Sequence, residues 1–472
     1  MAAARPQSSF VKDILAARSG TALAWALAAM LGYAALHPEL NIFEGFSLPR
    51  LVLTLAFVAI CAVYWLWLRD AARAARTESA SFARAAAPAW PVLAAALVSP
   101  PISSDPLLYL HYGTMALEGK NPYLFPSSAL TSPFSSSVVW DQTCAYGPVA
   151  LASFSLAARL ASAFWGVAAL KLLWLGAHLF GGYACFRLAS ERRTLLTRAF
   201  LFNPILLLAY LVDAHVDALV AALLLWGCVA MTRDRGRLAL IAFAAATLTK
   251  GFALPALGFW FAWALSRRRY AIALSGVWLL AAIVALLALT LFPTLSAWQS
   301  LLNLVPNTGR SIQHVLLLLG PSLGFDGPRA AALYSWLARG AFVVAAATLW
   351  LRALRSPDYG ASLLARDFAL LFLLACLFVV PFVPWWYSAL VLAATLWNRA
   401  AASLRSVALV YGFCTAITLS AGSGLSRAGL IGALLAIVPA SALLLFFAWR
   451  SRAERVPAAS LSDMRVSDNP TG

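Results

Sequence analysis

Charged residues are scarce in this chain. They make up 11% of its 472 residues, whereas hydrophobic residues make up 62%. A soluble domain carries roughly a quarter charged residues, and a soluble chain of this length would fold as about three domains joined by polar linkers. No such linker interrupts the apolar runs between Ser19 and Trp449. The composition excludes a soluble enzyme, a disordered chain and a disulfide scaffold, and predicts an all-α, polytopic integral membrane protein.

Acidic residues and cysteines are also few. The 18 Asp and Glu residues face 35 Lys and Arg residues, which gives a net charge of +17. The basic residues lie between apolar runs, so they indicate cytoplasmic loops and not a nucleic-acid partner. The six cysteines show no CxxC spacing and the five histidines are scattered. We therefore recognise no disulfide pair, and we expect no metal and no resident cofactor.

The distribution of arginine predicts the topology. Basic residues near both termini predict that both ends of the chain lie in the cytoplasm. Residues 1–456 form a single membrane domain with about 13–14 crossings, and residues 457–472 form a disordered cytoplasmic tail. Single spans are expected at residues 20–36, 51–68, 85–97, 167–186, 271–292, 330–351, 406–419 and 428–448.

Residues 99–147 form the longest predicted outside loop. The apolar stretches 148–164 and 167–186 follow it, and the next loop is rich in arginine and therefore inside. A chain that passes from outside to inside crosses the membrane an odd number of times. One of these two apolar stretches therefore does not cross the membrane. We expect residues 148–164 to lie along the membrane or to re-enter it.

Three apolar segments are too short for two full spans of about 20 residues each. These predicted hairpins occupy residues 199–232, 238–266 and 367–398, and their outer tips are residues 212–217, 249–251 and 381–387. Polar groups are costly in hydrocarbon. We therefore expect the tips to lie below the outer surface and to line a wet cavity.

A catalytic carboxylate on the outer face of the membrane must come from the acidic residues that the topology places outside or at the hairpin tips. Asp105 stands a few residues beyond the third span, where partial burial would raise its pKa and make it a general base. Ser104 or Asp105 followed by Pro106 is equally a helix-start pattern, and the two roles are compatible. The predicted outer acidic residues are Glu39, Glu44, Asp105, Glu118, Asp141, Asp213, Asp217 and Asp326.

The three tips and a further predicted outside loop, residues 293–329, carry the other candidate residues. Asp213 and Asp217 have the i, i+4 spacing of one helix face, and with His215 they suggest a sugar-binding or metal-binding tip, or a capped and solvated turn. Lys250 and Arg310 are cations on the outer side that suit a phosphate, although Lys250 could instead pair with Asp213 or Asp217. The remaining candidates, for stacking on or orienting a sugar, are His314, Trp385, Trp386 and Tyr387, and the three aromatics would otherwise form an interfacial belt.

The order of these motifs resembles that of the GT-C membrane glycosyltransferases, above all the polyprenol-phosphate-mannose-dependent mannosyltransferases of bacteria. The resemblance runs from about Ser99 to Trp397. It rests on Asp105, Tyr109, Tyr112-Gly113, Gly119-Lys120-Asn121-Pro122-Tyr123, Tyr146-Gly147-Pro148, Asn203-Pro204, Ala214-His215-Val216-Asp217-Ala218, Lys250 and Pro384-Trp385-Trp386-Tyr387.

The resemblance implies an enzyme of the bacterial inner membrane that uses a lipid-phosphate-linked hexose on the periplasmic face. Mannose is the first candidate for this hexose. Asp105 would deprotonate an acceptor hydroxyl of a cell-envelope glycolipid or glycan, which attacks the anomeric carbon with inversion. Lys250 and Arg310 would stabilise the departing phosphate. Sugar or acceptor contacts would come from Tyr109, Tyr112, Asn121, Tyr123, Asp213, His215, Asp217, His314, Trp385, Trp386 and Tyr387.

Two positions depart from the family pattern. Pro106 follows Asp105, so the paired acidic residues of many relatives are missing and a metal is less needed. Val216 stands where an asparagine is expected, so acceptor contacts differ. The alternative function is a transporter or flippase of a lipid-linked or anionic substrate, because broken hairpins with buried charges also serve transport.

Overall fold

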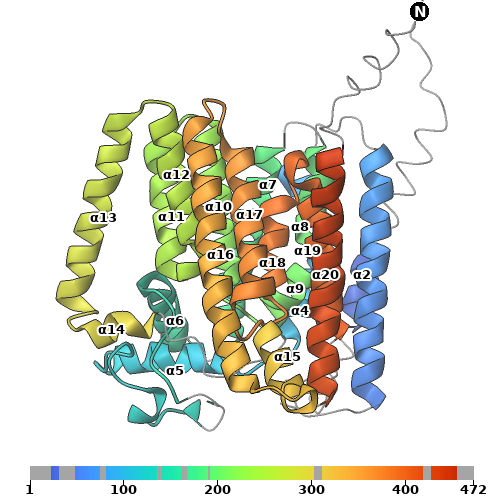
Figure 1. Cartoon of the computed structure of the whole chain (residues 1–472), viewed down its shortest axis with the longest axis horizontal. Helices are drawn as coiled ribbons and strands as arrows, with labels where there is room; N and C mark the ends of the chain where they lie inside the picture. The colour runs from blue at the N-terminus through green and yellow to red at the C-terminus, as the bar shows by residue number, and fades with distance from the viewer. Residues whose placement is uncertain are drawn as a thin grey trace, which may run out of the picture.

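The computed structural model describes residues 23–30, 48–74, 81–101, 103–135, 138, 141–160, 167–189, 192–301, 311–417 and 427–453. Every regular element in these ranges is helical, as the composition predicted (Figure 1). The first predicted span and the predicted tail fall largely or wholly outside the described residues.

Long apolar helices form one class of element. Among the described residues, five helices have the length and hydropathy of a membrane span, and a sixth is obtained if a bent pair is counted as one. Only 17% of the apolar stretch of α13 and 11% of that of α16 are buried within the protein, so both present apolar side chains outward. The protein is therefore a multi-pass membrane protein. The long helices are α7 (Val167–Leu188), α13 (Tyr270–Thr290), α16 (Gly327–Arg355), α17 (Ala361–Leu374, apolar to Val379) and α20 (Arg427–Ala453).

Shorter helices build the three predicted hairpins. The first arm of the first hairpin is bent by 44° at Asn203 and Pro204, where the Asn203 side chain caps the new helix. A π-helical turn precedes the first tip and another precedes the third, a feature common at functional sites. The first hairpin consists of α8 (Arg193–Leu201), α9 (Pro204–Leu207), η5 (Leu208–Val212) and α10 (Asp217–Thr232). The second consists of α11 (Gly236–Thr249), η6 (Gly251–Ala253) and α12 (Leu254–Ser266). The third consists of α17, η8 (Ala375–Val379) and α18 (Tyr387–Thr395).

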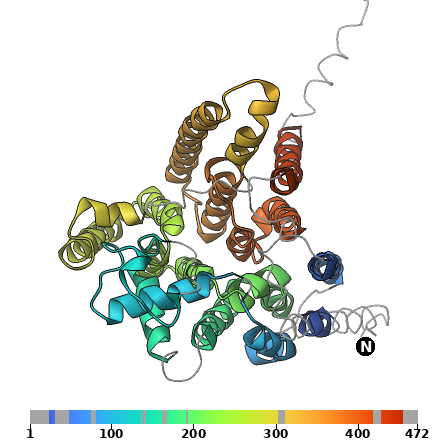
Figure 2. The same ribbon diagram turned by 90° about the horizontal axis from the view of Figure 1, so that it is seen from below.

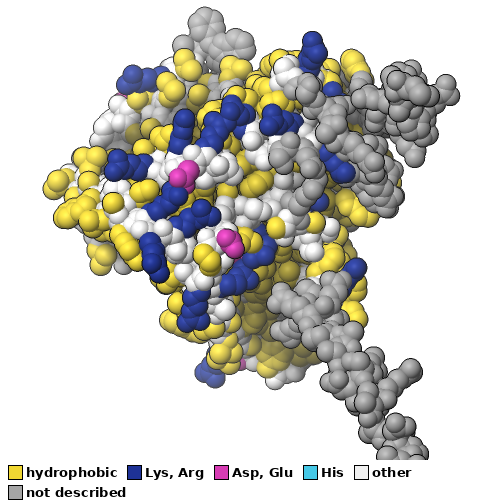
Figure 3. Space-filling model, turned by 90° about the horizontal axis from the view of Figure 1, so that it is seen from above, with side chains coloured by type: hydrophobic (Ala, Val, Ile, Leu, Met, Phe, Trp, Pro, Cys, Tyr) yellow, Lys and Arg dark blue, Asp and Glu magenta, His cyan; other side chains and the backbone are white. Residues whose placement is uncertain are grey.

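The helices end in two unlike faces, which we call the basic end and the loop end. The basic end holds the α10–α11 and α12–α13 connections with Arg233, Arg235 and residues 267–269, and Lys and Arg side chains gather there (Figure 3). At the loop end, α5 (Asp105–Leu117) lies across the ends of other helices (Figures 1 and 2). This arrangement agrees with the predicted sidedness. Also at the loop end are α6 (Pro148–Leu160), α14 (Leu295–Ser300), α15 (Ile312–Leu319) and η7 (Pro321–Leu323).

The remaining helices flank this bundle. Helix α6 has 13 residues, fewer than the roughly 20 of a full span. Whether residues 148–164 cross the membrane stays a prediction, because residues 161–164 lie outside the described ranges. The flanking elements are α2 (Leu48–Ala74), α3 (Phe82–Ala86), η1 (Ala87–Ala89), α4 (Trp90–Val98), η2 (Ser127–Ala129), η9 (Arg399–Ala401) and α19 (Ala402–Ile417).

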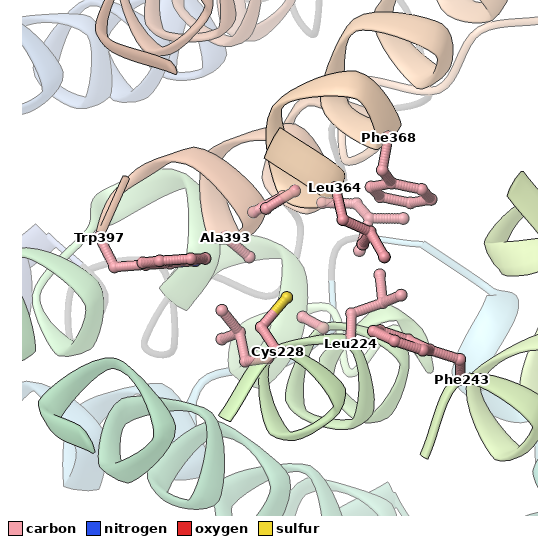
Figure 4. A pocket seen from close by; sticks show the side chains of 12 residues that line it. Leu224, Cys228, Phe243, Leu364, Phe368, Ala393 and Trp397 are labelled. Carbon is pink, nitrogen blue, oxygen red and sulfur yellow. The ribbon is translucent and has the colours of Figure 1, made fainter. Parts of the chain in front are cut away.

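The centre of the hairpin bundle is closely packed. A cavity of about 10 Å³ lies between α10, α11, α17 and α18 (Figure 4). A single water needs about 10–15 Å³ of such space, so this apolar gap holds no substrate. Its lining includes Leu224, Cys228, Phe243, Leu364, Phe368 and Trp397.

Candidate active site

Asp105 is the first residue of α5, so the predicted helix start is correct. Ser104 is in the N-cap position without a side-chain capping bond, and Pro106 lies in the first turn. The missing N–H of a proline costs nothing there. A carboxylate in the first turn also interacts favourably with the positive end of the helix dipole. The Asp105 side chain is 17% exposed, which leaves it reachable from outside.

Two glycines allow the loop end to pack closely around Asp105. A Cβ on Gly113 of α5 would lie 2.4 Å from the carbonyl oxygen of Phe154 in α6. A Cβ on Gly147 would lie 2.0 Å from the carbonyl oxygen of Leu248 in α11. No side chain fits at such distances, so Gly113 allows α5 to lie against α6, and Gly147 allows the Tyr146 segment to lie against α11 of the second hairpin.

The first tip is a strained turn that precedes α10. The N–H groups of Asp213 and His215 donate to the carbonyls of Leu208 and Ala209 in the π-helical turn. Ala214 between them has φ 49°, in the left-handed region that a residue with a Cβ seldom adopts. Helix α10 begins at Asp217. The prediction that Asp213 and Asp217 share one helix face is therefore wrong, because the π-helical turn and the left-handed residue end the first arm before Asp213.

His215 lies between two carboxylates. Its Nε2 is 2.6 Å from Oδ2 of Asp213, and its Nδ1 is 3.6 Å from Oδ2 of Asp105. The same Nδ1 is 3.1 Å from the Tyr109 hydroxyl. Trp386 of the third tip stacks on the imidazole at 3.8 Å between ring centroids. The histidine thus joins α5, the first tip and the third tip, and the prediction of a fully solvated turn is wrong for this buried tip.

The Asp105 carboxylate is partly desolvated and has spare hydrogen-bonding capacity. Burial raises its pKa; the charges of His215 and Lys250 oppose that rise, and those of Asp213 and Asp217 add to it. Within the described part of the chain, no hydrogen bond reaches its carboxylate oxygens. A carboxylate with a raised pKa and free lone pairs is suited to accept a proton.

Lys250 pairs with Asp217 inside the protein. The lysine follows the last residue of α11, and its Nζ is 2.9 Å and 3.1 Å from the two carboxylate oxygens. The ammonium also lies 4.8 Å from the ring centroid of Tyr387 and 5.9 Å from that of Tyr146. Of the two interpretations of Lys250, the structure shows the internal ion pair, with Asp217 as the partner. A phosphate contact by Lys250 stays a prediction.

The aromatic residues of the third tip are buried. Trp385, Trp386 and Tyr387 are 1%, 8% and 9% exposed. The alternative of an interfacial aromatic belt is therefore wrong, because the rings are packed inside the protein: Trp386 lies on His215, Tyr387 lies beside Lys250 and Trp385 packs against Trp386.

Other predicted residues hold the long loop in place. The Tyr112 hydroxyl donates to the carbonyl of Gln142 at 2.8 Å, and the Asn121 amide donates to that of Leu291 at 2.8 Å. Tyr123 packs on Phe292 with ring centroids 4.3 Å apart. These contacts hold the described part of the loop against α5 and the end of α13, and none of them is a contact with His215.

The remaining predictions concern α15 and metals. His314 is buried on α15, next to Ser311, whose hydroxyl donates to the carbonyl of Pro381 in the third tip. Arg310 lies outside the described residues. Among the residues that the structure describes, no group of three His, Cys, Asp or Glu side chains is arranged to hold a metal ion.

Three contacts at the site involve residues absent from the predicted set. The Ser103 N–H donates to Oδ1 of Asp213 at 2.6 Å, and the Tyr146 hydroxyl donates to that of Tyr109 at 3.3 Å. Lys171 of α7 is buried beside the segment that leads to Asp105. Tyr146 belongs to a quoted motif, and a lysine within an apolar run is itself a sign of function.

The comparisons with known proteins identify the family of this chain. A family model described as "Alpha-(1->6)-mannopyranosyltransferase, N-terminal domain" matches residues 13–267, more than half of the chain. The matched region holds Asp105, the first tip and Lys250, and it ends before the third tip. The comparisons with curated proteins and with solved structures found no significant match. The resemblance inferred from the motifs is confirmed: the chain belongs to the alpha-(1→6)-mannopyranosyltransferase family of membrane glycosyltransferases.

Proposed function

We propose that this protein transfers mannose from a polyprenyl-phosphate donor to a glycolipid or glycan acceptor of the cell envelope. The reaction would take place on the periplasmic face of a bacterial inner membrane, with both termini in the cytoplasm. The observation that carries the proposal is the Asp105 carboxylate, which is 17% exposed beside a buried histidine. It lies at the loop end, opposite the arginines of the basic end.

Asp105 is the proposed general base. An Asp105 oxygen takes the proton of the acceptor hydroxyl while that hydroxyl oxygen forms a bond to the anomeric carbon of the sugar. The bond from this carbon to the phosphate oxygen breaks, and the lipid phosphate leaves with the electron pair. This single displacement inverts the anomeric carbon. An α-(1→6) product, as the family description implies, then requires a β-linked donor.

Two cations, Lys250 and Arg310, are the proposed partners of the donor phosphate. Lys250 is 8% exposed and lies beside Tyr146 and Tyr387. Its charge is balanced by Asp217 in the structure, so an arriving phosphate shares Lys250 with that carboxylate. Arg310 is the proposed second cation. A preorganised cation stabilises the charge that develops on a leaving phosphate. We propose no metal and no resident cofactor in this step.

The remaining side chains of the site are the proposed sugar and acceptor contacts. His215 lies 3.6 Å from the Asp105 carboxylate, and Tyr109 and Trp386 contact the imidazole of His215. A lipid-linked donor is supported by two features of the protein. The described residues contain no β-strand, so they build no parallel sheet of the kind that binds nucleotides. The exterior of α13 and α16 is apolar and faces lipid.

The test is transfer of radiolabelled mannose from polyprenyl-phosphate-mannose by the purified protein in lipid. A cell-envelope lipid extract serves as the acceptor, and wild type is compared with Asp105→Asn. We expect labelled product from the wild type and a loss of about 10²–10⁴-fold in the variant. Equal transfer by both would remove Asp105 as the base. No transfer from any lipid-linked hexose would contradict the donor and favour a transporter or flippase.

A further inference from the structure

Lys171 is a buried cation that the proposed reaction does not use. It lies one turn into α7, one of the helices long enough to span the membrane, and is 2% exposed. An ammonium group inside a membrane protein is costly unless it has strong partners, and such residues are commonly functional. The groups that the Lys171 ammonium binds therefore indicate its role in the structure.

Lys171 binds the C-terminal end of α4. Its ammonium donates to the carbonyl of Ala96 at 3.0 Å and also to the carbonyl of Ser99, the C-cap residue of α4. The last carbonyls of a helix have no partner within the helix and carry the negative end of its dipole. A cation at this point fixes where α4 ends and the direction in which the chain leaves it.

The chain that leaves α4 is the short segment that carries the base. Pro100 and Pro101 follow Ser99, and each restricts the backbone and lacks an N–H. The Ser103 N–H is then held by Asp213 at 2.6 Å, and the Ser103 hydroxyl accepts from the N–H of Asp105 at 3.4 Å. The segment is thus fixed at one point by a cation and at a second point by an anion.

The two anchors are themselves linked. The charge of Asp213 acts on Lys171, and Asp213 also binds the imidazole beside Asp105 at 2.6 Å. Removal of the ammonium therefore loosens the end of α4 and leaves Asp213 with one cation fewer. Both changes act on the position of the Asp105 carboxylate relative to His215.

We propose that Lys171 is a positioning residue, whose ammonium group holds the end of α4 so that residues 99–105 present the Asp105 carboxylate beside His215. The inference rests on the proposed function for its catalytic consequence only. The placement of the segment can be measured without any turnover, so the two proposals can fail separately.

The first experiment measures that placement by cysteine labelling. A cysteine is introduced as Asp105→Cys, and its reaction rate with a membrane-impermeant maleimide is measured with Lys171 intact and in Lys171→Met. The native cysteines among the described residues are buried, which keeps their background low. Lys120→Met is the matched control, because Lys120 also donates to a backbone carbonyl, that of Ala129, but at the far side of the loop.

We expect Lys171→Met to raise the labelling rate at position 105 at least about fivefold, because the anchored segment gains freedom. Lys171→Arg should stay near the rate with Lys171 intact, since a guanidinium also donates to two carbonyls. A cysteine at the exposed end of α5, Glu118→Cys, should react at an unchanged rate. An unchanged rate at position 105 would overturn the proposal, and equal increases at both positions would show a general loss of structure and overturn it as well.

The second experiment measures turnover. If Asp105 is the base, Lys171→Met should lower kcat about 10- to 100-fold with the donor KM nearly unchanged, since a displacement of about 1 Å costs that much. When Lys171→Met is added to the Asp105→Asn variant, kcat should not fall further. A rise in KM alone, or full additivity of the two losses, would contradict a role through Asp105. Failure of the wild type to transfer mannose would instead overturn the proposed function and leave the labelling result standing.

Discussion

Two carboxylates at opposite ends of the protein differ in how many hydrogen bonds their oxygens accept. At the basic end, Asp367 of α17 accepts from Arg352 at 2.7 Å, from Arg366 at 3.0 Å and from the Tyr359 hydroxyl at 3.2 Å. At the loop end, the Asp105 carboxylate lies 3.6 Å from Nδ1 of His215, beyond hydrogen-bond distance. One carboxylate has several strong donors, and within the described residues the other has none.

The difference separates a structural carboxylate from a reactive one. The side chain of Asp367 is fully buried while its arginine partners are 51% and 28% exposed, so its charge is compensated and it holds α16 to α17. Asp105 is partly exposed and has free lone pairs, so it can receive a proton from a substrate. Asp367 lies in the middle of α17, so its side chain is buried between the helices while its arginine partners reach solvent.

The largest expected effect is a loss of activity without a loss of stability in Asp105→Asn. The amide keeps the shape of the side chain but cannot act as a base, so mannosyl transfer should fall about 10²–10⁴-fold. Since no donor binds the Asp105 carboxylate, we expect thermal unfolding, followed by tryptophan fluorescence in lipid, to be unchanged. A drop in the unfolding temperature comparable with that of Asp367→Asn would break the comparison.

Lys250→Met should cause the largest loss of stability, because it leaves the fully buried Asp217 carboxylate without its cation. Removal of one partner of a buried pair costs about 3–5 kcal/mol. The matched double variant Lys250→Met with Asp217→Asn should recover part of that free energy of unfolding, measured by thermal or denaturant unfolding in lipid. If the double variant is no more stable than the single one, Asp217 is not the residue that needs Lys250.

Asp367→Asn should destabilise the protein by about 1–3 kcal/mol, the usual cost of losing strong hydrogen bonds to a buried acceptor. The loss is smaller than for Lys250→Met because Arg352 and Arg366 reach solvent and keep their hydration. Once the protein is folded, mannosyl transfer by this variant should be close to that of the wild type. A reduced kcat with normal unfolding would place Asp367 in the reaction and contradict its structural role.

The smallest expected effect is a displaced pH profile. The pKa of Asp105 is raised above its ordinary value of 3.8, chiefly by burial. Because the ionised form is the base, kcat/KM should fall as the pH is lowered through this raised pKa, and therefore at a higher pH than for a solvated aspartate. A profile that stays flat down to about pH 4 would contradict either the burial of Asp105 or its role as the base.

Much of the fold was predictable from the sequence. Apolar runs and arginine clusters act locally, so they predicted the helical membrane fold, the two unlike ends and the three short hairpins. The helix start at Asp105 was equally visible, because Asp105 and Pro106 determine it with their nearest neighbours. The motif residues His215, Lys250 and Trp386 were named from the sequence, and the structure brings them together.

The arrangement within the site was decided by the tertiary structure. A π-helical turn and the left-handed Ala214 place Asp213 outside α10, which a regular i, i+4 spacing does not reveal. The pairing of Lys250 with Asp217 and the capping of α4 by Lys171 join residues far apart in the chain. Hydropathy and helix-start patterns depend on neighbouring residues, whereas the partner of a buried charge depends on which distant groups packing brings within a few ångströms, and only the folded chain fixes that.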